Sequence, residues 1–129
     1  MHREPIPEEL HRFILTSVRS VPVVEAVLLF RAAKGGPLDV RRLAQRLYLP
    51  EKQAGEIVAE LHEAGVLARE AELPDCYRYA PASPELGAML EMLAHFYASN
   101  LVDVTRLIHS STARRAMQFA DAFKLRKDS

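Results

Sequence analysis

The amino-acid sequence predicts a mainly α-helical fold with a small β-hairpin, and three observations lead to this prediction. Apolar residues recur at steps of three and four through most of the chain, which is the period of amphipathic helices. Two short apolar stretches, residues 66–71 and 76–80, are joined by the turn-forming segment Glu72-Leu73-Pro74-Asp75. Proline and glycine mark most of the boundaries between these segments, as they do at helix ends and turns.

The composition is that of an ordinary globular protein. The 129 residues are about one domain's worth, and 49% are hydrophobic while 26% are charged. The single cysteine, Cys76, cannot form an internal disulfide, which fits a reducing compartment. No apolar run approaches the roughly 20 residues that span a bilayer, and the N-terminus lacks the apolar core of a signal peptide. We expect a cytoplasmic protein that does not associate with membranes.

The first third of the chain predicts two helices. Pro5 and Pro7 open a helix within residues 1–21, in which apolar side chains form one stripe. Residues 22–33 are apolar nearly all round, so this second helix is expected at the buried centre of the fold. The segment Lys-Gly-Gly-Pro at 34–37 ends it.

The next segments occur in an order that is typical of a winged helix-turn-helix. A short strand at Leu38 precedes a helix at 39–47, whose first residue is a good N-cap. A turn and a second helix at 51–64 follow, and Gly65 leads into the hairpin, which would be the wing. We assign residues 22–81 to this motif, with a N-terminal helix (1–21) and C-terminal helices (82–129) flanking it in a single domain.

The C-terminal part predicts a long helix that begins at Pro84 with Ser83 as its N-cap, then a short basic helix at 113–127. Seven residues of the long helix alternate steps of four and three and form a heptad-like seam: Leu86, Leu90, Leu93, Tyr97, Asn100, Val104 and Leu107. We expect this seam to mediate homodimerisation, with Asn100 setting the register across the dimer axis. The alternative is that the helix folds back onto its own chain at Leu10, Phe13 and Ile14.

The middle of the chain resembles the winged-helix regulators of bacteria, most closely the MarR-like group and related small one-domain regulators. The matching residues are the ten from Leu38 to Leu47, the pair Ile57-Val58 and the run Leu61-His62-Glu63-Ala64-Gly65-Val66-Leu67. The last run marks a helix that turns sharply into a wing, and the match covers about a third of the chain. The resemblance implies a transcriptional regulator that binds double-stranded DNA through the 51–64 helix.

Seven residues are candidates for contacts with DNA. Lys52 and Gln53 begin the second helix of the motif, where they could read base edges. Arg41, Arg42 and Arg46 lie on the outer face of the first helix and could contact phosphates, although each could equally belong to a solvated helix face. On the wing, Arg69 and Arg78 could reach the DNA backbone. We slightly favour ion pairs of these two residues with the adjacent acids Glu70 and Glu72.

The charge distribution conflicts with this interpretation. Net charge is zero, but residues 50–91 contain three basic and nine acidic side chains, whereas residues 1–49 contain eight and five. The 51–64 helix, which would be the recognition helix, has four acidic residues: Glu51, Glu56, Glu60 and Glu63. Acidic residues repel the phosphates of DNA. The alternative function is therefore a protein–protein interaction module whose acidic helix face meets a basic partner and binds no DNA. A small-molecule effector between the long helices would add to the first interpretation.

The sequence gives no sign of catalysis, a metal or a cofactor. His95 and His109 lie fourteen residues apart, about 21 Å along one helix, so they cannot share a metal within one chain. Cys76 has no cysteine or histidine near it in the sequence that would suggest a zinc site. Neither a phosphate-binding glycine loop nor a nucleophile elbow is present. We expect a protein that is not an enzyme.

Overall fold

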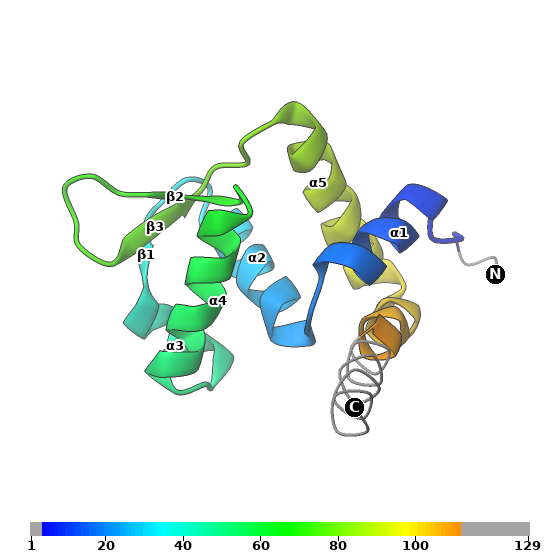
Figure 1. Cartoon of the computed structure of the whole chain (residues 1–129), viewed down its shortest axis with the longest axis horizontal. Helices are drawn as coiled ribbons and strands as arrows, with labels where there is room; N and C mark the ends of the chain where they lie inside the picture. The colour runs from blue at the N-terminus through cyan, green and yellow to red at the C-terminus, as the bar shows by residue number, and fades with distance from the viewer. Residues whose placement is uncertain (1–3, 112–129) are drawn as a thin grey trace, which may run out of the picture. The chain divides into compact units, whose positions relative to one another are not determined.

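The computed structural model describes residues 4–111, and these fall into two compact units. One unit comprises residues 22–94, and the other combines the N-terminal segment up to Val21 with the chain from His95 onward. The described chain is mainly helical and contains one small three-stranded antiparallel sheet (Figure 1). The predicted helical class with a small hairpin is therefore confirmed.

The unit of residues 22–94 is built around α2, as the apolar sequence of this helix predicted. Its elements are α2 (Val21–Ala32), β1 (Leu38–Asp39), α3 (Val40–Leu47), α4 (Glu51–Glu63), β2 (Leu67–Arg69), β3 (Cys76–Tyr79) and the first part of α5 (Pro84–Ser99). Val24, Ala26 and Phe30 of α2 are fully buried. At the exposed end of the same helix, the Arg31 Nε donates to the Glu91 carboxylate of α5 at 2.7 Å.

The sheet has the strand order β1-β3-β2, with both neighbouring pairs antiparallel. Leu38 of β1 lies opposite Tyr77 of β3, and Leu67 of β2 lies opposite Tyr79. The two hairpin strands are shorter than the sequence predicted, because β2 ends at Arg69 and β3 at Tyr79. The short β1 adds an edge strand that ties the start of α3 to the hairpin.

Local signals fix the ends of the helices in this unit. The Asp39 carboxylate accepts a hydrogen bond from the Arg42 amide at 2.6 Å, and the Ser83 hydroxyl accepts one from the Leu86 amide at 3.1 Å. Both predicted N-caps are thereby confirmed. After α4, Gly65 adopts a positive φ of 84°, which turns the chain out of the helix toward β2.

The second unit contains α1 (Glu8–Ser17) and a helix at residues 101–111. Its buried core includes Leu10 and Ile14 of α1 together with Val104 and Ile108. Hydrogen bonds join the N-terminal segment of this unit to residues 95–111. The Ser111 hydroxyl, for example, donates to the Leu15 carbonyl at 2.8 Å.

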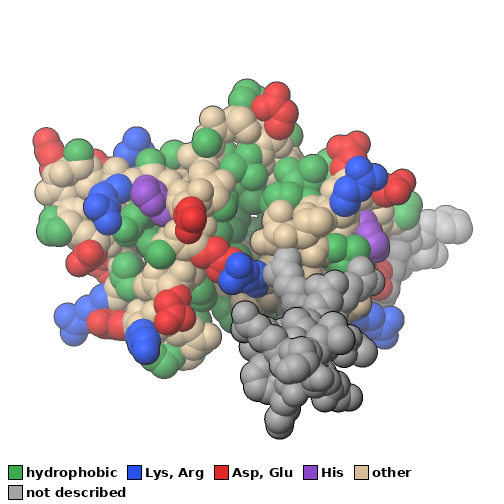
Figure 2. Space-filling model, viewed as in Figure 1, with side chains coloured by type: hydrophobic (Ala, Val, Ile, Leu, Met, Phe, Trp, Pro, Cys, Tyr) green, Lys and Arg blue, Asp and Glu red, His purple; other side chains and the backbone are tan. Residues whose placement is uncertain are grey.

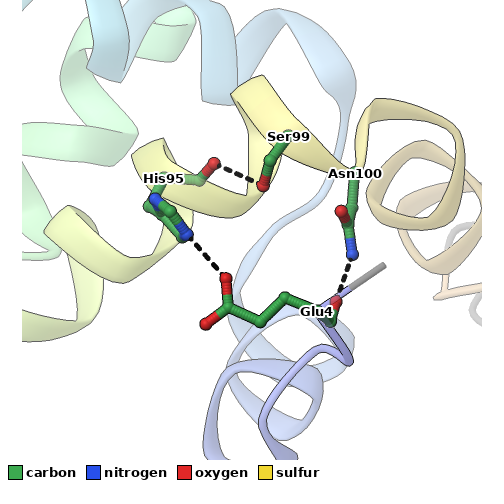
Figure 3. A network of polar contacts seen from close by, with 4 residues as sticks. All are labelled: Glu4, His95, Ser99 and Asn100. Atoms are coloured by element: carbon green, nitrogen blue, oxygen red, sulfur yellow. Dashed lines mark hydrogen bonds and ion pairs between the residues drawn. The ribbon is translucent and has the colours of Figure 1, made fainter. Parts of the chain in front are cut away.

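The predicted continuous C-terminal helix is wrong, because α5 ends at Ser99 and a new helix begins at residue 101. Asn100 at the break is 5% exposed, and its side-chain amide donates to the Glu4 carbonyl at 2.7 Å (Figure 3). The Glu4 carboxylate lies 3.0 Å from His95 Nε2 in the same network. The Asn100 amide thus has a partner within its own chain, and its expected role in the register of a dimer stays a prediction. The predicted basic helix at 113–127 lies outside the described residues.

No single described helix is long and apolar enough to cross a membrane. Only α1 and α2 taken together, across the break between them, reach the necessary length and composition. Five residues of α2 are buried in the protein, as expected of a core helix: Val23, Val24, Ala26, Val27 and Phe30.

Candidate nucleic-acid interface

The helix α4 has one buried and one exposed face, because its apolar residues recur at steps of three and four. Four residues form the buried face, as predicted: Ala54, Ile57, Val58 and Leu61. On the other side Lys52, Gln53 and Glu56 are exposed. The two candidate base-reading residues therefore stand in the first turn of α4 with their side chains in solvent.

Three arginines of α3 are exposed, but only two of them lack an acidic partner. The Arg41 Nε lies 3.8 Å from a carboxylate oxygen of Glu51, the first residue of α4. Within the described residues, Arg42 and Arg46 make no ion pair. An exposed pair at this distance is weak, so Arg41 is partly neutralised and not immobilised.

The two arginines of the hairpin, Arg69 and Arg78, differ from each other. Arg78 pairs with Glu70 at 3.4 Å, as we slightly favoured from the sequence. Arg69 does not pair with Glu70 or Glu72. It donates instead to the Tyr77 hydroxyl at 3.2 Å, and its guanidinium lies 5.8 Å from the centre of the Tyr77 ring.

The register of the hairpin explains this difference, because Arg69 and Tyr77 lie directly opposite each other on β2 and β3. The hydrogen bond with Tyr77, followed by the charge of the ionised tyrosine, raises the pKa of Arg69 above its already high value. The ring of Tyr77 also meets His62 of α4 edge-on, at 5.6 Å between ring centres. Arg69 therefore stays cationic and lies against Tyr77 of the neighbouring strand β3.

A hollow of about 630 Å³ opens where the N-terminal ends of α3 and α4 meet the loop between β2 and β3. Seven residues line it: Asp39, Val40, Arg41, Glu51, Lys52, Pro74 and Asp75. Three of these residues are acidic and two are cationic, and Figure 2 shows the same mixture of signs over the visible face of α3, α4 and the hairpin. Among residues 4–111, no group of three histidine, cysteine or acidic side chains could hold a metal ion.

The proposed acidic face of α4 is made by three exposed acids, Glu51, Glu56 and Glu63. The fourth, Glu60, is half-buried and interacts with another residue. Since Glu51 also pairs with Arg41, Glu56 and Glu63 are the acids most available to an approaching partner.

The residues assigned to a dimerisation seam divide by burial. Leu90, Leu93 and Val104 are at most 2% exposed within a single chain, and Asn100 is bonded to Glu4. The remaining three are half-buried: Leu86, Tyr97 and Leu107. The apolar side chains most exposed in this region are instead Leu101 and Val102, at 49% and 50%.

The sequence interpretation missed Tyr48, the residue that joins α3 to the turn before α4. Its side chain is 94% exposed, and its backbone is left-handed with φ 57° and ψ 44°. A tyrosine in a turn between two helices of the motif is the signal that could have identified it, because bulky residues are uncommon in that conformation.

Comparisons with protein-family models, with curated proteins and with solved structures found no significant match to this chain. We therefore infer the function from the geometry of the residues at the ends of α3 and α4 and on the hairpin.

Proposed function

We propose that this protein is a winged-helix transcriptional regulator that binds double-stranded DNA as a homodimer. The observation that carries the proposal is the order of the elements, in which β1, α3, α4 and a β2–β3 hairpin follow one another and β1 closes the sheet against β3. In a motif of this kind the second helix enters the major groove and the hairpin lies beside it. The exposed polar face of α4 supports that role.

Each candidate residue has a specific part in the proposal. Lys52 and Gln53, in the first turn of α4, would meet base edges in the major groove. Arg42 and Arg46 would meet phosphates, because neither is engaged by an acid in the described chain. Arg69 would meet the backbone from the wing, with Tyr77 orienting its guanidinium.

The expected salt dependence follows from these cations. Three exposed arginines are assigned to phosphates and make no ion pair within the described residues: Arg42, Arg46 and Arg69. Each phosphate contact contributes about −0.9 to the slope of log K against log salt, so one chain gives a slope of about −2.7. Raising salt from about 50 to 200 mM would then weaken binding roughly 40-fold per chain, and far more for two chains bound together.

A fluorescence-anisotropy titration against a mixed-sequence duplex at several salt concentrations tests the proposal. Arg42→Ala and Arg46→Ala should each shallow the slope by about 0.9 per chain. Arg12→Ala is the matched control, because Arg12 is an exposed arginine of α1 whose only described ion pair is with Glu8. Absence of binding by the unmodified protein even at low salt would refute the proposal.

A second function, a module that binds a basic protein, is favoured by the charge of the unit that contains the motif. Residues 22–94 contain eight basic and eleven acidic side chains. Glu56→Lys separates the two functions. It should strengthen binding to the mixed-sequence duplex by removing repulsion of phosphates from α4, whereas it should abolish capture of a basic partner. Glu25→Lys, at an exposed position of α2, is the control for a simple change in net charge.

A further inference from the structure

The turn between α3 and α4 contains Tyr48, a large aromatic residue in a backbone conformation and at an exposed position where such residues are uncommon. Tyr48 is the C-cap of α3 and has a left-handed backbone, with φ 57° and ψ 44°. For a residue with a Cβ atom this region is sterically costly, and glycine or asparagine is the usual choice there. A tyrosine at this position therefore reduces the stability of the turn.

The side chain of Tyr48 does not contribute to the stability of the fold. It is 94% exposed, so its ring buries almost no apolar surface. The hydrogen bonds of the turn come from the backbone, where the Tyr48 amide donates to the Gln45 carbonyl at 3.4 Å and the Leu49 amide to the Ala44 carbonyl at 3.0 Å. Glycine would make the same bonds. Residues that are strained without a structural benefit occur preferentially at functional sites.

The position of Tyr48 indicates what it contacts. It follows the α3 turn that bears Arg46, and it precedes Pro50, the N-cap of α4, by two residues. It thus lies in the chain between the unpaired phosphate-binding candidates of α3 and the base-reading candidate Lys52. A tyrosine hydroxyl is a neutral donor of the kind that contacts DNA phosphates beside a recognition helix.

We propose that the Tyr48 hydroxyl donates a hydrogen bond to a phosphate oxygen of the DNA backbone next to α4. The inference depends on the proposed DNA-binding function and adds a neutral contact to its cationic ones. Because a neutral donor displaces no counterion, loss of this contact should weaken binding equally at every salt concentration. This separates it from the arginine contacts, which change the slope.

The test compares Tyr48→Phe and Tyr48→Gly with the unmodified protein, in duplex titrations over a range of salt and in urea unfolding. Tyr48→Phe removes only the hydroxyl, so it should weaken DNA binding about two- to tenfold at each salt concentration with an unchanged slope. Tyr48→Gly should weaken binding at least as much while raising the urea midpoint, because it removes the backbone strain. Tyr79→Phe is the matched control, since the Tyr79 hydroxyl lies inside the fold.

The outcomes separate the inference from the function on which it depends. Binding by the unmodified protein together with equal binding by Tyr48→Phe would overturn the inference and leave the function standing. A loss in Tyr48→Gly that Tyr48→Phe does not share would also overturn it, because the ring and not the hydroxyl would make the contact. Equal DNA binding by Tyr48→Phe, Tyr48→Gly and the unmodified protein would place Tyr48 outside the DNA interface altogether. Absence of DNA binding by the unmodified protein would end both proposals.

Discussion

Replacement of Gly65 by alanine should destabilise the protein, because this residue makes the turn from α4 into the hairpin. Its φ is +84°, a conformation that costs an L-residue about 1–2 kcal/mol. The added Cβ would also lie 3.1 Å from the Ala82 Cβ, which is closer than ordinary contact. Ala82 cannot easily withdraw, since its amide donates to the Gly65 carbonyl at 2.8 Å. The combined loss in unfolding free energy should be about 2–3 kcal/mol.

Urea unfolding followed by circular dichroism measures this loss. For an m-value of about 2 kcal/mol/M, the midpoint should fall by roughly 1–1.5 M. Gly55→Ala is the matched control within α4, where the new Cβ would lie 3.8 Å from Val40 Cγ1 and meet only ordinary contact. That change should stabilise the helix by about 0.5–1 kcal/mol, because alanine is the better helix former. A Gly65→Ala protein as stable as the unmodified one, or two shifts of the same sign, would refute the reasoning.

Three further predictions concern the core, the helix break and assembly. Burial raises the pKa of Tyr79, whose hydroxyl has no hydrogen-bond partner among the described residues. Because the pKa is higher in the folded protein, the free energy of unfolding should fall as pH rises above about 10. This fall should be smaller for Tyr79→Phe, which should also be at least as stable as the unmodified protein at neutral pH. Asn100→Ala should cost about 1–3 kcal/mol in urea unfolding, because it leaves the Glu4 carbonyl without its donor; an unchanged midpoint would contradict this. Leu101→Asp with Val102→Asp should convert the proposed homodimer to a monomer in sedimentation velocity, and an unaltered sedimentation coefficient would exclude these exposed residues from its interface.

Much of the fold could be predicted because its signals are local in the sequence. The side chains of Asp39 and Ser83 each accept a hydrogen bond from an amide only three residues further along the chain. The buried face of α4 follows from the helical spacing of its apolar residues alone. The turn at Gly65 follows from the freedom of glycine to adopt positive φ. These rules require no knowledge of residues elsewhere in the chain.

The features that were missed depend on partners that are distant in the sequence or on the register of pairing. At the helix break, Asn100 bonds the carbonyl of Glu4, which lies 96 positions away in the sequence. The heptad-like spacing of apolar residues continues across Asn100 and therefore did not indicate the break. Arg69 bonds Tyr77 and not its acidic sequence neighbours, because the hairpin register places the two opposite each other. Of the candidate site, the sequence predicted the buried face of α4 and the ion pair of Arg78 with an adjacent acid, but it did not predict the pair of Arg41 with Glu51.

The ion pairs on the candidate face help to explain how a motif typical of DNA binding can have an acidic surface. Arg41 and Arg78 each lie beside an acid, so the phosphates of random DNA would meet few free cations. Non-specific affinity comes almost entirely from such contacts and should therefore be low. Contacts with bases do not require free cations. A glutamate such as Glu56 can accept a hydrogen bond from the cytosine amino group, although it repels phosphates elsewhere. A regulator with this surface should prefer its own operator over random sequence by a large ratio despite modest affinity, whereas a protein-binding module should show no preference among duplexes.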